Sequence, residues 1–168
     1  MSDVLDMPDF ARHLVNLASP RLGAKTLSCS DDFFAPMERI LQDGEPVFIA
    51  DKFDDHGKWM DGWESRRRRG GGFDHLVIHL GTRGIIKGVD IDTRYFTGNY
   101  PPKASIEVAD GGHSSQPGAL AWRELLSETP LGPDCHHYVS ISDPEPATHL
   151  RLNIFPDGGV ARLRVYGE

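Results

Sequence analysis

The sequence predicts an all-β protein, a β-sandwich with loops clustered at its ends and one or two short helices. Eighteen glycines and twelve prolines separate short apolar runs, a punctuation typical of a chain of strands. Several runs alternate apolar and polar residues, which is the period of a strand with one buried face. At 168 residues the chain is long enough for one domain with a substantial core and short for two.

Three alternating segments are expected to form the middle of the sandwich. They read HLVIHL over residues 75–80, KGVDIDTRYF over 87–96 and SIEVAD over 105–110. Their apolar rows are Leu76, Ile78 and Leu80; Val89 and Ile91; and Ile106 and Val108. Asp90 and Asp92 lie on the face opposite the second row, because successive side chains of a strand point to opposite faces.

The segment 148–167, THLRLNIFPDGGVARLRVYG, has the clearest strand pattern in the chain. Leu150, Leu152 and Ile154 form one apolar row, and Ala161, Leu163 and Val165 form another. The residues between them, PDGG at 156–159, are typical of a tight turn. The pattern therefore predicts a hairpin in which the two rows belong to paired strands.

Helical patterns are sparse. PMERIL at 36–41 predicts a short helix with Pro36 in its first turn and with Met37, Ile40 and Leu41 on one side. AWRELLSE at 121–128 is expected to form one or two helical turns.

Composition excludes several classes of function. The 18 basic residues against 25 acidic ones give a net charge of −7, which disfavours nucleic acid as a partner. No apolar stretch approaches the ~20 residues that span a bilayer, and the start MSDVLDMPDF does not read as a secretory signal. Cys29 and Cys135 lie far apart and outside any CxxC motif. We expect a reduced protein of the cytoplasm, with no membrane partner.

The segment 51–72, DKFDDHGKWMDGWESRRRRGGG, fits neither a core strand nor an ordinary surface loop. One interpretation is a surface loop whose tryptophans close the end of the sandwich while its arginines stay solvated. A second is a nucleic-acid patch, which the interleaved carboxylates disfavour. The third is a wall that binds a small polar anion. Arginine holds a carboxylate through two parallel hydrogen bonds, and carboxylates accept hydrogen bonds from amide or urea-like NH groups.

Several strings of the sequence resemble the allantoicase family. They are NLASPRLGAK (16–25), DDFFAP (31–36), DKFDDHGKWMDGWESRRRR (51–69), GVDIDTRYFTGNYPP (88–102) and RLNIFPDGGVARLRVYG (151–167). The resemblance runs from about residue 16 to residue 167 in one order. It implies a jelly-roll sandwich of the galactose-binding-domain-like type. It also implies hydrolysis of allantoate to ureidoglycolate and urea in purine-nitrogen salvage.

Members of that family generally hold two homologous repeats in tandem, and this sequence resembles the first. The expected organisation is an N-terminal extension over residues 1–15 and one jelly-roll domain over residues 16–168. We read the chain as a single-repeat relative or as the first half of a longer enzyme. A site shared between repeats would then be completed by a second repeat or by a homo-oligomer.

The reaction suggests the catalytic candidates. Loss of urea from allantoate needs a proton for the leaving nitrogen and an activated water, hence an acid and a base. His56 is the natural candidate, since imidazole titrates near pH ~6.5, and a loop histidine bonded to backbone is the alternative. Asp61 is expected to orient His56 or to accept ureido NH groups. Asp92, at the end of its strand, is the third candidate, against a plain ion pair with a neighbouring base.

The binding candidates fall on two walls. On the first, Arg66 and Arg67 are expected to clamp the substrate carboxylate, while Arg68 and Arg69 are expected to be solvated. The other members of this wall are Lys58 as a second cation, Trp63 to exclude water, and Glu64 as an acceptor or charge balance. The second wall consists of Tyr95, Thr97 and Asn99, whose groups suit urea. Both walls are expected to line one pocket.

Metal ligands form no strong pattern. His75 and His79 share a strand face but lie two pleats apart, and the adjacent His136 and His137 point to opposite faces. HxH, HExxH and CxxC motifs are absent from the sequence. We therefore expect no required cofactor and leave a divalent ion as an alternative. The rival function is a non-catalytic β-sandwich module that binds a small ureido acid or a sugar-like ligand.

Overall fold

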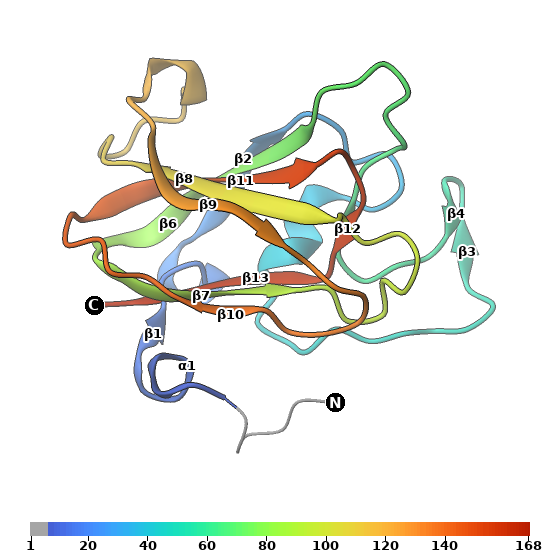
Figure 1. Ribbon diagram of the computed structural model, residues 1–168, viewed down its shortest axis with the longest axis horizontal. Helices are drawn as coiled ribbons and strands as arrows, with labels where there is room; N and C mark the ends of the chain where they lie inside the picture. The colour runs from blue at the N-terminus through green and yellow to red at the C-terminus, as the bar shows by residue number, and fades with distance from the viewer. Residues whose placement is uncertain (1–6) are drawn as a thin grey trace.

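The computed structural model describes residues 7–168, which form a jelly-roll β-sandwich of two stacked antiparallel sheets (Figure 1). One sheet has four strands, in the order β1 (Val15–Asn16), β13 (Arg162–Gly167), β7 (Ile86–Asp92) and β10 (Tyr138–Ser140). The other has five, in the order β2 (Lys25–Cys29), β6 (Asp74–Gly84), β11 (Ala147–Phe155), β8 (Lys103–Ala109) and β9 (Arg123–Pro130). The predicted fold class is confirmed.

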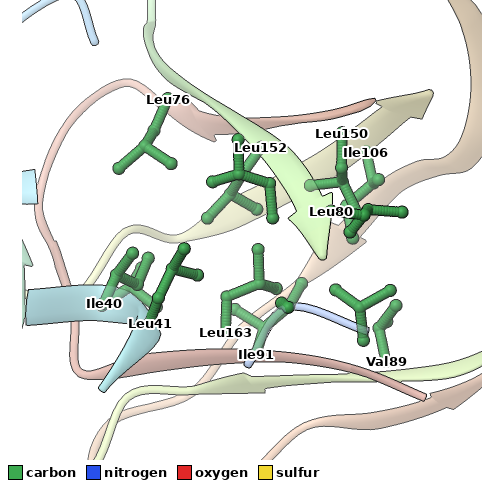
Figure 2. Close-up of a cluster of buried hydrophobic side chains, with 14 of the residues drawn as sticks. Ile40, Leu41, Leu76, Leu80, Val89, Ile91, Ile106, Leu150, Leu152 and Leu163 are labelled. Atoms are coloured by element: carbon green, nitrogen blue, oxygen red, sulfur yellow. The ribbon is translucent and has the colours of Figure 1, made fainter. Parts of the chain in front are cut away.

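The core lies between the two sheets, and the predicted apolar rows fill it. Figure 2 shows Leu76, Leu80, Ile106, Leu150 and Leu152 on one side of the core, facing Val89, Ile91 and Leu163 on the other. All of these side chains are buried. Alternation within each strand therefore predicted correctly which side chains point inward.

The predicted C-terminal hairpin is wrong. β11 pairs with β6 on one edge and β8 on the other, so neither edge is free for β13. β13 crosses to the second sheet and pairs with β7 and β1. The two apolar rows face each other across the core instead of lying side by side. Between them the chain forms β12 (Gly159–Val160), which pairs with β5 (Trp63–Glu64).

The two predicted helices have different outcomes. The first is present as a 3-10 helix, η3 (Met37–Leu41), which buries Ile40 and Leu41 at one end of the core (Figure 2). The second prediction is wrong, because residues 123–128 of that segment belong to the edge strand β9 (Arg123–Pro130). Irregular pairing between β8 and β9 lets the adjacent Leu125 and Leu126 both pack on the core, and this spacing resembles a helical one.

The N-terminal part of the described chain packs on the outer face of the four-stranded sheet. Helix α1 (Asp9–His13) lies within the predicted extension and places Phe10 against Tyr138 and Tyr166. Gly88 has no room for a side chain, because Phe10 fills that space. Residues 1–6 of the predicted extension lie outside the described residues. Two further 3-10 turns are η2 (Pro20–Leu22) and η4 (Pro117–Ala119).

The small ribbons lie at one end of the sandwich. The pair β5 and β12 lies there, and the hairpin of β3 (Phe53–Asp54) and β4 (Gly57–Lys58) projects beyond it (Figure 1, right). The loop that carries the four arginines and the loop between β7 and β8 lie at this same end (Figure 1). None of the helices in residues 7–168 has the length and apolar character to cross a membrane.

Candidate functional site

A cleft of about 570 Å³ opens where three segments meet at this end of the sandwich. One wall comes from β5 and the arginine run, a second from the loop after β7, and a third from the turn before β12. Its polar lining consists mainly of Glu64, Arg67, Arg68, Asn99, Tyr100 and Asp157. We call it the Glu64 cleft. Segments 35 and 93 residues apart in sequence meet in it, through the pairs Glu64–Asn99 and Ser65–Gly158.

Strand β5 positions Glu64 because its two residues point in opposite directions. Trp63 is fully buried in the core, and its Nε1 donates a hydrogen bond to the carbonyl of Asp31 at 2.9 Å. Glu64 points the other way, into the cleft. Gly159 faces Glu64 across the ribbon, and a side chain there would collide with the ring of Phe96. The predicted wall residue Trp63 is therefore a core residue that anchors the wall.

The surroundings of Glu64 favour its protonated form. Burial raises the pKa of this carboxyl, and the nearby Asp157 carboxylate adds to the increase. Asn99 opposes them, since its Nδ2 donates to Glu64 Oε2 at 3.0 Å, and the net direction is upward. A carboxyl with a raised pKa in a cleft can both give and take a proton closer to neutral pH.

The four arginines of the run differ in how many partners they have. Arg66 is tied to Asp31, with Nη2 to Oδ1 at 2.8 Å, and its guanidinium lies over the ring of Phe33. Arg68 is anchored to Asp74 at 2.8 Å and, through its backbone N–H, to Asp157. Arg67 is exposed and has no hydrogen-bond or ion-pair partner among residues 7–168. Of the two predicted clamp residues, Arg67 is the one whose guanidinium is free to bind a ligand.

A second pocket, of about 440 Å³, adjoins the cleft and shares Gly98 and Asn99 with it. It brings together the predicted binding residues Lys58, Tyr95, Thr97 and Asn99. Tyr95 has a φ of 72°, uncommon for a residue with a side chain, and its N–H donates to Asp134. Its ring stacks on Phe48, with 6.0 Å between the ring centroids. Such backbone geometry is often found at functional sites.

His56 lies outside both pockets. It is exposed on the β3–β4 hairpin, and its backbone N–H donates to Asp54 Oδ1 at 2.8 Å. Its imidazole meets the ring of Phe33 edge-on, with 4.4 Å between centroids. Phe33 in turn contacts Phe34, which lines the cleft. The ring of Phe33 therefore separates His56 from Phe34, which lines the Glu64 cleft.

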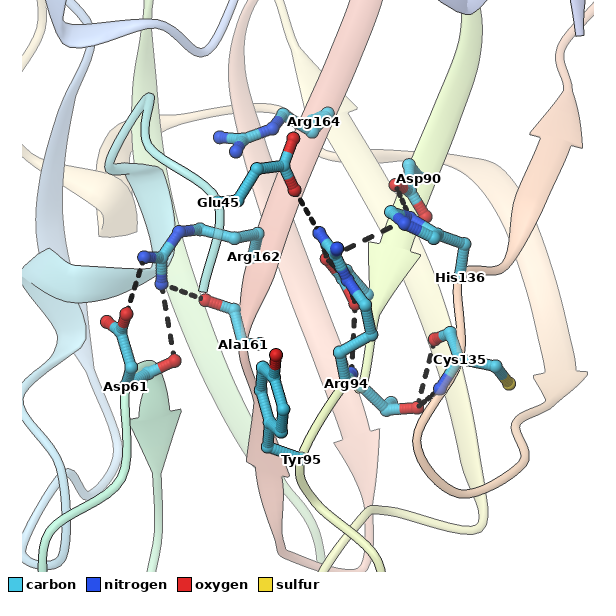
Figure 3. Close-up of polar contacts among 12 residues, drawn as sticks. Glu45, Asp61, Asp90, Arg94, Tyr95, Cys135, His136, Ala161, Arg162 and Arg164 are labelled. Carbon is cyan, nitrogen blue, oxygen red and sulfur yellow. Dashed lines mark hydrogen bonds and ion pairs between the residues drawn. The ribbon is translucent and has the colours of Figure 1, made fainter. Parts of the chain in front are cut away.

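Asp61 forms a buried ion pair instead of facing the cleft (Figure 3). Its Oδ2 accepts from Arg162 Nη2 at 2.9 Å, and the side chains of Asp61 and Arg162 are 8% and 1% exposed. The same Oδ2 accepts from the backbone N–H of Val47. The position of Asp61 does not bring it to His56 or to Glu64, contrary to the expectation that it orients the histidine.

Asp92 belongs to a polar cluster on the outer face of the four-stranded sheet (Figure 3). It binds the guanidinium of Arg94, which also contacts Glu45. Beside it, His136 Nδ1 lies 2.6 Å from Asp90 Oδ2. Burial lowers the pKa of His136, but the hydrogen bond and charge of Asp90 outweigh it and the net direction is upward. Asp92 thus forms the ion pair that was the alternative to a catalytic role.

The same cluster holds the one group of three candidate metal ligands found among residues 7–168. Donor atoms of Asp90, Asp92 and His136 all lie within 4.8 Å of one another. Each of the three already has a protein partner, and the guanidinium of Arg94 supplies a positive charge at the place where an ion would bind. These are the residues that could hold a divalent ion.

The two predicted walls therefore meet, and the contact joins two of the predicted wall residues, while other predicted residues lie elsewhere. Glu64 and Asn99 bridge them, whereas Trp63 is turned inward and His56 stands outside. Sequence reasoning missed Asp157 as a lining residue. The turn that contains it was interpreted as an ordinary hairpin turn, and its composition, PDGG, carries no further signal.

The comparisons with known proteins agree with this architecture. A family model described as the allantoicase repeat matches residues 15–168. The chain belongs to the allantoicase family. A probable allantoicase of Ralstonia nicotianae is 54% identical over 161 residues, which are 96% of this chain and 48% of that protein. One from Acinetobacter baylyi is 51% identical over 100% of this chain and 50% of its own length. The chain thus spans about half the length of these allantoicase relatives.

Solved allantoicase structures match the sandwich. One, described as the structure of allantoicase, has a TM-score of 0.84 at 30% identity and covers 99% of this chain and 54% of its own. The allantoicase of Saccharomyces cerevisiae gives a TM-score of 0.81 over the same shares of the two chains, also at 30% identity. A family 32 carbohydrate-binding module of Clostridium perfringens, solved with galactose, has a TM-score of 0.62 at 16% identity. It covers 90% of this chain and 99% of the module, and this likeness is one of fold alone.

Proposed function

We propose that this allantoicase repeat carries a reaction site for the hydrolysis of allantoate to ureidoglycolate and urea. The observation that supports the proposal best is the buried Glu64, which has a raised pKa and accepts a hydrogen bond from Asn99. It lies beside Arg67, which has no hydrogen-bond or ion-pair partner within the described part of the chain. Membership of the allantoicase family and the likeness to solved allantoicases support the same reaction.

The lining of the Glu64 cleft matches the groups of allantoate, which carries a carboxylate and two ureido groups on one carbon. Arg67 would take the carboxylate through charge-assisted hydrogen bonds. The amide of Asn99 would bond a ureido group, and Lys58, Tyr95 and Thr97 in the adjoining pocket would contact the second one. These contacts orient the bond to be broken against Glu64.

Glu64 is proposed as the acid and base of the reaction. Protonated, it would give its proton to the leaving ureido nitrogen as the bond from that nitrogen to the central carbon breaks, releasing urea. The resulting carboxylate would then take a proton from the water that adds to the same carbon. That water oxygen becomes the hydroxyl of ureidoglycolate, and Glu64 is restored. No cofactor is needed for this sequence of steps. Should a divalent ion take part, Asp90, Asp92 and His136 are its candidate ligands.

Glu64→Gln tests the assignment, because glutamine keeps the shape and the bond with Asn99 but cannot transfer a proton. Urea release should fall by about 10²–10⁴-fold, the usual contribution of general acid–base catalysis. Stability should stay equal or rise slightly, since a buried carboxyl with a raised pKa costs stability at neutral pH. Both are measured on purified chain, by a urea-release assay and by urea denaturation.

His56→Ala is the matched variant, since His56 is the acid–base candidate that the sequence suggests. With the proposed role for Glu64, His56→Ala keeps most of the urea release. Loss of urea release in His56→Ala with full activity in Glu64→Gln would transfer the catalytic role to the histidine, and the hairpin would then have to reach the cleft.

Pairing with another repeat is part of the proposal. The relatives are about twice as long as this chain, so they have room for a second unit of this size. The projecting hairpin also exposes Phe53, whose surface is 67% accessible. We propose that a second repeat, or a second copy of this chain, completes the site. Size-exclusion chromatography alongside the urea-release assay would then find activity in the oligomeric fraction. The cytoplasmic location stays a prediction.

A non-catalytic binding module is the second candidate. The stacked pair of Phe48 and Tyr95, both partly exposed beside Lys58 and Asn99, is a surface on which a small ring or planar ligand can lie. Allantoate or a sugar that raises the melting temperature of the chain, with no urea released by any oligomer, would favour this function.

A further inference from the structure

A pocket on the far side of the arginine run has a chemistry that the proposed reaction does not use. Its volume is about 440 Å³, and Arg67 and Arg68 line both this pocket and the Glu64 cleft. Arg69, Ser30 and Asp74 line this pocket alone. We call it the Arg69 pocket. The arginine run therefore forms a partition with a ligand-sized space on each side.

The Arg69 pocket has an excess of positive charge. Four guanidinium groups, those of residues 66–69, face two carboxylates, those of Asp31 and Asp74, which leaves two positive charges uncompensated. Arg66 neutralises Asp31, and Arg68 neutralises Asp74. Arg67 and Arg69 are exposed, and neither has a hydrogen-bond or ion-pair partner within residues 7–168. Two free guanidinium groups on one pocket suit a carboxylate.

Asp74 requires a hydrogen-bond donor from the ligand, whereas the arginines require an acceptor. It is fully buried at the start of β6, and its Oδ1 accepts from Ser30 Oγ at 2.7 Å and from Arg68 Nη1 at 2.8 Å. Its Oδ2 is also buried and has no hydrogen-bond donor among the described residues. Buried carboxylate oxygens are rarely left without a donor, because the lost hydration is not replaced. A ligand in this pocket that carries an NH group would supply the donor.

The loop that shapes the pocket is preorganised. Arg68 Nε donates to the carbonyl of Gly71 at 3.1 Å, so the loop closes on its own side chain. Gly71 and Gly72 have φ values of 82° and 87°, a backbone conformation that glycine adopts freely. The guanidinium of Arg68 is held by Asp74 and Gly71, so the arginine side of the pocket is ordered before a ligand binds. The buried Oδ2 of Asp74 is reached after a local shift of the side chains around it.

We propose that the Arg69 pocket is a second binding site for ureido carboxylates, small anions in which an NH-bearing ureido group stands next to a carboxylate. The carboxylate binds Arg69 and Arg67, and the ureido NH binds Asp74 Oδ2. Both allantoate and ureidoglycolate have this chemistry, and their identification as ligands rests on the proposed function. An anion without a hydrogen-bond donor, such as acetate, satisfies the arginines but leaves Asp74 Oδ2 without a donor. Since Arg67 serves both spaces, a ligand in the Arg69 pocket weakens carboxylate binding in the Glu64 cleft.

Isothermal titration calorimetry of the full chain tests this site with two variants. Ureidoglycolate is measured in the otherwise unchanged chain, and allantoate is measured in the Glu64→Gln background so that it is not consumed. Acetate, which has the carboxylate but neither a ureido group nor any other hydrogen-bond donor, and inorganic phosphate are the comparison probes. Arg69→Ala should weaken the second binding event of both ureido carboxylates, and that of acetate, by about tenfold or more.

Asp74→Asn is the sharper variant, because asparagine keeps an oxygen for Ser30 and Arg68 and replaces Oδ2 with an NH₂ group. It should weaken the ureido carboxylates by about tenfold or more without weakening acetate, because it removes the acceptor for NH while leaving the arginines in place, and the melting temperature should report an intact fold. Whichever of allantoate and ureidoglycolate binds more tightly is the ligand of the pocket. Equal losses for acetate and the ureido carboxylates in Asp74→Asn, unchanged binding in both variants, or binding of phosphate alone would overturn the proposal.

The outcome is separable from that of the proposed function. Arg69 does not line the Glu64 cleft, so Arg69→Ala should retain urea release at low allantoate and relieve inhibition by added ureidoglycolate. Two binding events without any urea release would remove the proposed function and keep this site. Urea release with a single binding event that Arg69→Ala and Asp74→Asn leave unaltered would keep the proposed function and remove the Arg69 pocket as a binding site.

Discussion

Two groups of arginines in this chain perform opposite tasks. Arg162 and Arg164, on β13, have their guanidinium groups used by the protein itself. Arg67 and Arg69, in the exposed run, have no protein partner among residues 7–168. The number of acceptors that the fold supplies, and not the number of arginines in a string, decides which of them are available to a ligand.

The arginines of β13 hold a loop against the sheet. Arg162 donates to the carbonyl of Gly44. It also donates to the carbonyl and the carboxylate of Asp61 (Figure 3). Arg164 donates to the carbonyls of Gln42 and Asp43. The loop that follows η3 is thereby fixed across the outer face of the four-stranded sheet. Asp92 and Arg94 extend the same network to Glu45.

Removing Arg162 should have the largest effect on stability. Arg162→Met leaves Asp61 buried without its partner, which typically costs about 3–5 kcal/mol in the free energy of unfolding. Arg67→Met is the matched control in the exposed run and should change it by less than about 0.5 kcal/mol. Urea denaturation monitored by tryptophan fluorescence measures both, and similar losses in the two variants would remove the distinction between the two groups.

Within the run, Arg67→Ala should lower kcat/KM for urea release by about 10- to 100-fold, since a hydrogen bond to a charged group is worth about 1.5–3 kcal/mol. Most of the loss should appear as a higher KM. Arg66→Ala is the neighbouring control and should lose less, because Asp31 already occupies its guanidinium. A greater loss for Arg66→Ala would make Arg66 the clamp, an assignment that the sequence alone leaves equally open.

The smallest effect concerns pH. Burial acts to raise the pKa of Glu45, but the hydrogen bond and charge of Arg94 outweigh it, and the net pKa lies below its ordinary value. The pair therefore stabilises the fold fully above about pH 4.3, the usual value for Glu, and loses this contribution as pH falls through the lower folded pKa. Since the Glu45 side chain is 73% exposed, solvent limits the effect to less than about 1 kcal/mol.

Glu45→Gln isolates this contribution. The difference in unfolding free energy between the unchanged chain and the variant should be present at pH 6 and should shrink as pH falls below about 4.3 and through the lower folded pKa of Glu45. Chemical denaturation at a series of pH values measures it. A difference that is constant down to pH 3 would mean that the carboxylate charge of Glu45 does not stabilise the loop.

The sequence predicted the faces of the strands better than their partners. Period two assigned Leu150 and Leu163 to the core, but it says nothing about which strand lies next to which. The predicted hairpin was wrong because β11 has both edges occupied. The two adjacent leucines of β9 imitated a helical spacing because the pairing there is irregular.

The site was predicted to the level of segments and less well to the level of side chains. The 51–72 motif and the loop after β7 do meet, through Glu64 and Asn99. Asp61 was expected near substrate, but its partner Arg162 lies 101 residues away in sequence, and nothing local reveals such a pair. Whether a polar residue serves the fold or the ligand depends on these distant acceptors and donors.

The two-residue strand β5 links the Glu64 cleft directly to the hydrophobic core. Trp63 and Glu64 are consecutive residues. Trp63 is held in the apolar core and Glu64 lines the cleft, so no residue between them can take up a movement of the core. Heat, denaturant or a cavity that lets the indole shift will displace the carboxyl by a comparable amount. With the proposed role of Glu64, urea release should be lost on warming before the secondary structure is lost. Substitutions that pack the interior around this indole more tightly should then prolong that activity.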